Sequence, residues 1–358
     1  MRRVVALLVI ACGGCSQAAA QPGRWADVPG PEPIKGITLA PIEDVRLGDV
    51  GYGSAHSAVA LDEIAELGAT WVSITPFGTM DDLRDTEVCP EVEKPLAENL
   101  GAVREVISQA QTRGLSVLLV PHVFVWSGEW RGLIEPGSDA GWRAWFESYE
   151  RFVLLWAKVA AETDSDGFSV GVEFLSSSQR YGWRWKELIA RVRQVYPGPI
   201  TYSANWDEVE HVAFWDDVDW IGLNAFQPLS DRPGATPAQL TAGARRFAAD
   251  MAQIARMHDR PLVLCEMGFK KMRDPAVRPW EWPEAMDASA ADPDAQATAY
   301  RALLAGFVPE PHFAGLFVWK YFSDPWDWTQ EEPFGFSPRG EVGEEVLRDW
   351  FAKPWRAH

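Results

Sequence analysis

Short apolar runs alternate with longer amphipathic stretches from residue 35 to residue 322. Each run is six to ten residues long and rich in β-branched and aromatic side chains, a composition typical of buried strands. Eight strands are predicted in this way, at residues 35–40, 70–78, 116–124, 167–174, 199–206, 219–226, 260–269 and 313–322.

The stretches between these runs have the periodicity of helices. Apolar residues recur at three- and four-residue spacing within residues 57–68, 99–114, 140–163 and 236–258. Gly68 and Gly114 stand where a glycine would end a helix before the next strand. This eightfold alternation of strand and helix favours the α/β class and a closed (β/α)8 TIM barrel. An open doubly wound sheet is less favoured, because no glycine-rich phosphate loop follows the first strand.

We expect one barrel domain over residues 34–358, since a barrel of this type fills a chain of this length. Residues 16–33 are rich in Ala, Pro and Gly without apolar periodicity, which is typical of a flexible tether. The net charge of −18 and the absence of a Lys/Arg cluster argue against nucleic acid as a partner. We expect the domain to be a monomer.

Residues 1–15 have the pattern of a signal peptide, with two arginines, an apolar stretch at 4–11 and then small residues. The apolar stretch is too short to span a bilayer. Residues 9–12 (VIAC) resemble a bacterial lipobox, which makes Cys12 the first lipidation candidate and Cys15 the second. The sequence therefore predicts an exported protein, either held in the bacterial cell envelope by an N-terminal lipid or secreted.

Several kinds of site have no support in the sequence. Of the two remaining cysteines, Cys265 lies in an apolar run, so we expect a buried free thiol and no disulfide framework. The histidines form no HExxH pair, and the aspartates lack the spacing of a calcium loop. No GxSxG motif is present. We therefore expect no metal, no organic cofactor and no serine-dependent hydrolysis.

The fourth predicted strand ends in a glutamate. Alternate residues of a barrel strand face the barrel axis or the helices. The apolar set Phe168, Val170 and Val172 is expected to face the helices. This alternation turns Glu173 inward at the carboxyl end of the strand, where barrel active sites are built.

The seventh predicted strand ends in the same way. Val263 and Cys265 are expected to face outward, and Leu262, Leu264 and Glu266 inward. One strand-end glutamate alone is more often a partner in a salt bridge. Two at matching depth favour catalysis, because glycoside hydrolysis uses one carboxylic acid and one carboxylate across the scissile bond.

Further polar and aromatic groups are expected at the same end of the barrel. Amide and imidazole groups suit recognition of sugar hydroxyls, and a flat indole covers the CH face of a pyranose. The candidates for substrate binding are His122, Trp126, Asn205, Trp206, Asn224 and Trp319.

Six stretches of the chain carry a family resemblance, at residues 121–136, 145–157, 168–174, 200–229, 262–269 and 315–322. Taken in order, they resemble glycoside hydrolase family 113, a group of β-1,4-mannanase-like barrels in the retaining clan A. The resemblance implies that Glu173 is the general acid/base and Glu266 the nucleophile, and that the substrate is a polysaccharide or oligosaccharide.

The chain departs from the clan pattern at two positions. Val172 stands where many members carry an asparagine directly before the acid/base, so Asn205 is expected to make the contact to the 2-hydroxyl instead. Phe226 stands near the place of a tyrosine that holds the nucleophile, with Tyr181 or Tyr321 as possible replacements.

The sequence thus predicts a retaining β-glycoside hydrolase, mannanase-like, acting by double displacement without a cofactor. Two alternatives stay open. One is an exo-acting glycosidase or a transglycosylase on another β-glycan. The other is a surface lipoprotein that binds glycan without cleaving it.

Overall fold

The computed structural model describes residues 32–41, 50–91, 94–281, 291–326 and 334–355. The predicted signal peptide, both lipidation candidates Cys12 and Cys15, and nearly all of the predicted tether lie outside these residues. Within the described ranges, no helix combines the length and the apolar composition needed to cross a bilayer.

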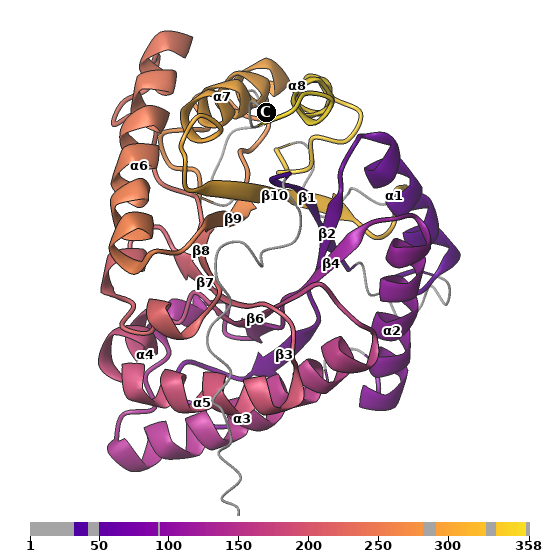
Figure 1. The fold of residues 1–358 in the computed structure, drawn as a ribbon, viewed down its shortest axis with the longest axis vertical. Helices are drawn as coiled ribbons and strands as arrows, with labels where there is room; N and C mark the ends of the chain where they lie inside the picture. Colours follow the sequence, from indigo (N-terminus) through magenta and orange to yellow (C-terminus); the bar gives the residue numbers. More distant parts are fainter. Residues whose placement is uncertain (1–31, 42–49, 92–93, 282–290, 327–333, 356–358) are drawn as a thin grey trace, which may run out of the picture.

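Eight parallel strands form a closed barrel (Figure 1), and each coincides with one of the eight predicted runs to within a few residues. Around the barrel they follow in chain order, with β10 pairing with β1. The strands are β1 (Ile34–Ala40), β2 (Trp71–Ile74), β4 (Ser116–Leu119), β6 (Gly167–Val172), β7 (Ile200–Asn205), β8 (Trp220–Asn224), β9 (Leu262–Met267) and β10 (Phe313–Phe322).

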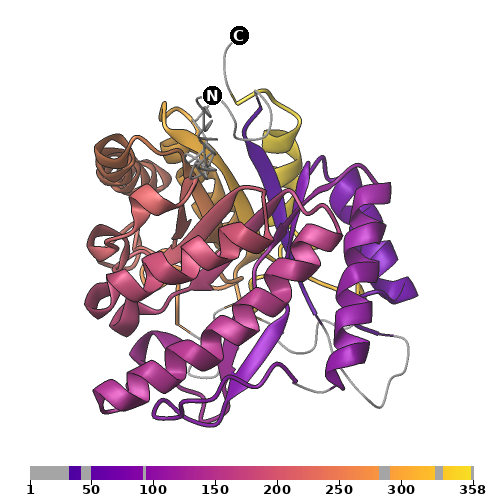
Figure 2. The same ribbon diagram turned by 60° about the horizontal axis from the view of Figure 1, so that its bottom comes forward.

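Helices surround the barrel, and in Figure 2 the long helix α3 lies beside α5 across the strands. The glycines predicted to end two helices, Gly68 and Gly114, have left-handed φ values of 92° and 75° and follow α1 and α2. The helices are α1 (Ala55–Glu66), α2 (Leu96–Thr112), α3 (Asp139–Glu162), α4 (Leu175–Arg180), α5 (Gly182–Val195), α6 (Pro237–His258), α7 (Pro293–Phe307) and α8 (Val342–Phe351).

The second and third predicted strands are each broken in two. Pro76 and Pro121 lie at the breaks, and because proline has no N–H it cannot continue the hydrogen-bond ladder of a central strand. After each break the chain forms a further short strand, β3 (Phe77–Met80) or β5 (His122–Val125), and these two pair with each other outside the barrel. This small sheet continues the barrel wall beyond β2 and β4.

The buried apolar residues fall into two main clusters. The larger one contains residues of the helices and the outward faces of the strands. The smaller one, here called the barrel core, contains no helix residue and fills the space inside the strands. Its members are Ile34, Trp71, Leu118, Val120, Val172, Trp220, Val263, Cys265, Ala314 and Phe317.

The predicted alternation is wrong in β6, because Val172 belongs to the barrel core and does not face the helices. Against β7 the register shifts between Ser169 and Val172, so β6 contains one extra residue. A bulge of this kind reverses which side chains point inward. At the bulge, a Cβ on Gly171 would lie 2.8 Å from the Trp185 ring, so only glycine fits there.

The alternation is also wrong in β9. Val263 and Cys265 lie in the barrel core, whereas Leu262 and Leu264 face the helices. The register against β8 shifts so that Asn224 pairs with Glu266, directly after Leu223 pairs with Leu264. The extra residue is Cys265, and its bulge keeps Glu266 on the inner side. As predicted, Cys265 is a buried free thiol.

Candidate active site

Glu173 is the first residue after β6 and is only 8% exposed. Its φ of 57° lies in the left-handed region, which a residue with a Cβ adopts rarely. Its backbone N–H donates to the carbonyl of Ser203 at 2.9 Å, so the hydrogen bonding between β6 and β7 continues through this conformation. The side chain is thereby held at the carboxyl end of the barrel.

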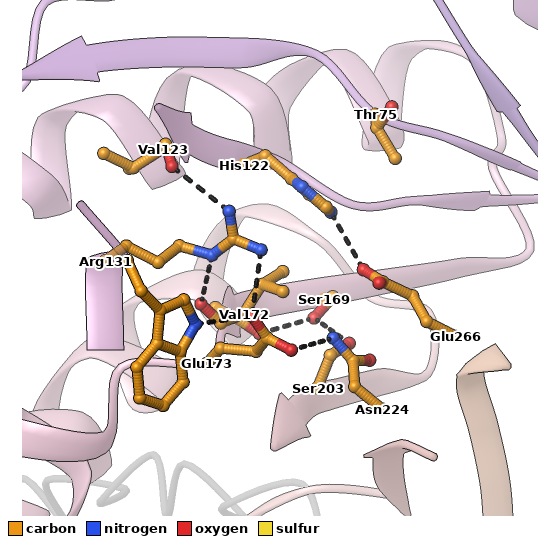
Figure 3. Close-up of polar contacts among 12 residues, drawn as sticks. Thr75, His122, Val123, Arg131, Ser169, Val172, Glu173, Ser203, Asn224 and Glu266 are labelled. Atoms are coloured by element: carbon orange, nitrogen blue, oxygen red, sulfur yellow. Dashed lines mark hydrogen bonds and ion pairs between the residues drawn. The ribbon is translucent and has the colours of Figure 1, made fainter. Parts of the chain in front are cut away.

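Three donors converge on the Glu173 carboxyl group. Trp130 Nε1 donates to Oε2 at 2.9 Å, and Arg131 Nη2 donates to the same oxygen at 3.2 Å. Asn224 Nδ2 donates to Oε1 at 3.0 Å (Figure 3). Both carboxyl oxygens are therefore fixed in orientation by groups from two different elements.

Arg131 is itself held by the backbone. Its Nε donates to the carbonyl of Val172 at 3.1 Å, and its Nη1 donates to the carbonyl of Val123 at 3.3 Å (Figure 3). Neither Arg131 nor Trp130 was predicted from the sequence. Both lie within residues 121–136, which contributed to the family resemblance, but Trp130 directly precedes and Arg131 begins a single 3-10 turn, which is too short to have a periodicity that would indicate where their side chains point.

Glu266 lies in β9 beside Asn224 of β8 and is 7% exposed. Burial raises its pKa to about 8, and the charge of Glu173 contributes to the rise. The positive charges of Arg131 and Lys320 and a hydrogen bond from Asn224 act in the opposite direction. The two glutamates are therefore electrostatically coupled, and the Asn224 amide acts on both.

His122 lies against Glu266, with 3.6 Å between its Nε2 and Oε1 of the carboxyl group. Its ring stacks on Trp319 at a centroid distance of 6.1 Å and an interplanar angle of 4°. Complete burial lowers the pKa of His122 well below 6.5, and the charges of Arg131 and Lys320 lower it further. The imidazole is thus neutral at physiological pH.

The aromatic candidates differ in exposure. Trp319 is half-buried: its ring stacks on His122, and the Lys320 Nζ lies 4.7 Å from the ring centroid. Trp126 is 55% exposed and packs edge-on against Phe124. These rings offer apolar surface at the carboxyl end of the barrel.

The remaining two predicted binding residues do not contact the glutamates directly. Asn205 is the register partner of Asn224, but its amide donates to Asp207 at 2.9 Å. Asn224 is the amide that contacts Glu173, and the contact of Asn205 with a sugar 2-hydroxyl stays a prediction. Trp206 stacks on Trp280 at 5.7 Å.

Neither suggested tyrosine reaches Glu266. Tyr181 packs against Trp142 with the ring centroids 4.9 Å apart, and Tyr321 belongs to the outer cluster, where it lies against Arg339. Phe226 packs against Phe336. In this chain His122 is the polar ring beside Glu266.

The structure therefore brings five of the predicted residues into one connected set. Glu173 and Glu266 interact electrostatically, Asn224 acts on both, and His122 links Glu266 to Trp319. Such a set, with two coupled carboxyls at the active end of a barrel and aromatic surface beside them, has the groups that acid-assisted cleavage of a glycosidic bond requires.

Comparisons with known proteins agree with this chemistry. The model of Glycoside Hydrolase Family 113 matches residues 48–338. A GH113 β-mannanase from Alicyclobacillus acidocaldarius is 28% identical with a TM-score of 0.76, covering 89% of this chain and 97% of that one. A second GH113 β-1,4-mannanase structure is 24% identical with a TM-score of 0.77, covering 89% and 99%.

More distant structures share only the fold. A family 5 mannosidase from Rhizomucor miehei is 10% identical with a TM-score of 0.66, covering 90% of this chain and 93% of that one. No match was found among curated proteins. Because the family model spans most of the chain and includes both glutamates, the chain belongs to Glycoside Hydrolase Family 113 and is a glycoside hydrolase.

Proposed function

We propose that this enzyme cleaves β-1,4-linked mannan or its oligosaccharides with retention of configuration. In this proposal Glu173 is the general acid/base and Glu266 the nucleophile. The observation that carries it is the coupling of the two buried carboxyls, in which the charge of Glu173 helps to raise the pKa of Glu266.

The reaction has two steps. Glu173 protonates the glycosidic oxygen while a carboxylate oxygen of Glu266 attacks the anomeric carbon, so one C–O bond breaks as another forms. The leaving saccharide departs with the proton. Glu173, now ionised, then takes a proton from water, which attacks the glycosyl-enzyme and frees Glu266.

The donors around Glu173 suit this cycle. Trp130, Arg131 and Asn224 all donate to the carboxyl group, so they hold both oxygens in one orientation. After Glu173 has given up its proton, the same hydrogen bonds stabilise the carboxylate that activates water.

The pH dependence of cleavage follows from the coupling of the two carboxyls. With the pKa of Glu266 raised to about 8, the pair holds at least one proton below that pH. Cleavage uses the form in which the proton is on Glu173 and Glu266 is ionised. Because the groups are coupled, the pH dependence of kcat/KM reports the pair and not either residue alone. We expect kcat/KM to fall as the pH rises above about 8.

Mannan is the favoured substrate for two reasons. The 28% identical relative is described as a β-mannanase. The half-buried Trp319 and the exposed Trp126 offer the flat apolar surface that suits the CH face of a pyranose.

Azide rescue tests the two roles separately. With an activated aryl β-mannoside the first step needs no acid, so Glu173→Ala should accumulate the glycosyl-enzyme. Azide should then attack from the face that water uses and give the β-mannosyl azide. Glu266→Ala has no nucleophile, and azide entering from the opposite face should give the α-mannosyl azide. Exchanged products, read by NMR, would exchange the roles, and an α-configured hemiacetal from the wild type would contradict retention.

A substrate panel tests the specificity and mode of action. The enzyme should release saccharides from β-mannan in preference to β-glucan, xylan and galactan, and the double variant Glu173→Gln/Glu266→Gln controls for contaminating activity. A ladder of early products indicates cleavage within chains, one short product indicates exo action, and products longer than the substrate indicate transglycosylation. Hydrolysis of another glycan but not mannan would overturn the substrate proposal.

A further inference from the structure

A second buried carboxyl network lies beside the catalytic pair. Glu208 follows β7 and is fully buried, and the proposed reaction does not use it. Its Oε1 accepts hydrogen bonds from the hydroxyls of Tyr202 and Ser178, and its Oε2 accepts one from the backbone N–H of Asn205 at 3.1 Å. One carboxyl group thereby joins the end of β7 to helix α4.

The network reaches the residue next to Glu173. The Tyr202 hydroxyl accepts a hydrogen bond from the backbone N–H of Phe174 at 2.8 Å. Phe174 directly follows Glu173, whose backbone has the left-handed φ of 57°. Such a conformation is strained for a residue with a Cβ and persists only where the surroundings enforce it. The bond from Phe174 to Tyr202 is one of the contacts that enforce it.

The direction of these hydrogen bonds depends on Glu208. In its ionised form Glu208 only accepts, so the Tyr202 hydroxyl directs its proton to Glu208 and leaves its oxygen free to accept from Phe174. Ser178 and Asn205 also donate to Glu208. A neutral side chain at this position would no longer accept hydrogen bonds only. The Tyr202 hydroxyl would then have no fixed direction.

Burying a carboxyl group at this position costs free energy of desolvation. Burial raises the pKa of Glu208 to about 7, and the charge of Glu173 contributes in the same direction, while the three hydrogen bonds lower it. A well-packed apolar residue would avoid this cost of desolvation. The carboxyl group offers in return a directed contact to the backbone beside Glu173.

We propose that Glu208, acting through Tyr202, is a positioning residue that holds Glu173 in the geometry for proton transfer to the leaving group. The inference rests on the proposed function, in which Glu173 is the general acid. It assigns no contact between Glu208 and the substrate.

Leaving-group dependence tests this role. The variants are Glu208→Gln and Tyr202→Phe, and the readout is kcat/KM for a manno-oligosaccharide and for a dinitrophenyl β-mannoside. The oligosaccharide needs acid assistance and the dinitrophenyl group does not. A misplaced acid should therefore lower kcat/KM about tenfold or more for the oligosaccharide and less than about twofold for the activated glycoside. A merely structural defect would lower both alike, and equal losses or no loss would overturn the proposal.

Tyr196→Phe is the matched control. The hydroxyl of Tyr196 is buried like that of Tyr202. It donates to the backbone carbonyl of Ser165 at 2.6 Å, near the opposite end of β6. It should leave the ratio of the two kcat/KM values unchanged. Melting temperatures accompany each measurement. If Glu208→Gln does not fold, Tyr202→Phe decides, and a ratio like that of Tyr196→Phe contradicts the proposal.

Glu173→Gln separates this inference from the proposed function. It should show the leaving-group dependence in full. If Glu173→Gln shows none, the assignment of the general acid fails. If Glu173→Gln shows it and neither Glu208→Gln nor Tyr202→Phe does, only the positioning role fails.

Discussion

Arg131 and Glu173 form an ion pair at 3.2 Å in which both side chains are largely buried. The guanidinium also donates to the carbonyl of Val172, the residue before Glu173. Arg131 therefore holds both the carboxylate of Glu173 and the backbone that precedes it. A buried pair fixed in this way cannot relax into solvent when one partner is removed, and the loss of either is costly.

Replacing Arg131 should therefore affect both rate and pH dependence. We expect Arg131→Met to lower kcat/KM by about 10²-fold, the effect of losing one preorganised donor. Arg131 also holds the pKa of Glu266 down, so its removal should raise that pKa above about 8 and move the alkaline fall of kcat/KM to higher pH. Arg151→Met, which breaks an exposed pair with Glu87, is the control. An alkaline fall at unchanged or lower pH would contradict this account.

Trp319 should contribute to substrate binding more than to stability. Its half-buried ring already has His122 on one side, and its remaining surface suits a sugar ring. Trp319→Ala should lower kcat/KM about tenfold with a small change in melting temperature. Trp185, fully buried among helices and strands, provides the contrast, since Trp185→Ala should cost about 3–5 kcal/mol of stability. A comparable loss of stability in both variants would show that Trp319 serves the core.

The buried Glu266 should make the enzyme less stable as the pH rises. Its pKa is raised from 4.5 to about 8, so between these values the folded state holds a proton that the unfolded state has released. Stability from this group is present below pH 4.5 and is lost as the pH rises through about 8. Glu266→Gln should therefore melt at a higher temperature than the wild type near neutral pH, with a gain that grows between pH 5 and pH 8. Glu147→Gln, on the exposed face of α3, controls for the chemical change.

The N-terminal residues support a separate proposal about location. We propose that Cys12 is lipidated, because residues 9–12 match a lipobox and a Pro-rich segment follows. The full-length protein should partition with membranes, and Cys12→Ser should release it. Release by Cys15→Ser alone would move the site to Cys15, and release by neither would indicate an ordinary secretory signal.

The barrel could be predicted because its signals are local and repeated. Each strand is an apolar run bounded by turns, and the four helices identified from the sequence each have their own periodicity, so the order of these elements required no knowledge of long-range contacts. The two breaks after β2 and β4 were not predicted, although Pro76 and Pro121 lie inside the predicted runs and proline is the residue that interrupts a central strand. What alternation could not predict were the bulges in β6 and β9, because an extra residue is defined only against the neighbouring strand.

The two glutamates were predicted to face inward by an alternation that is wrong in both strands. Val172 and Cys265 face inward as well, and the bulges together with the left-handed backbone of Glu173 bring the carboxyls to the same place. Trp130, Arg131 and Glu208 were missed for another reason. They lie in the connections between the main strands and helices, in or beside short 3-10 turns, where the direction of a side chain depends on tertiary contacts and leaves no pattern in the sequence.

The barrel core determines the route by which substrate reaches the catalytic carboxyls and products leave them. Trp71, Trp220 and Phe317 fill the space between the strands and are at most 5% exposed, so no passage leads along the barrel axis. A polymer must therefore approach the catalytic carboxyls from the carboxyl end of the strands. The two fragments produced by cleavage must leave by the same end, so entrance and exit are shared and departing products compete for space with the next chain.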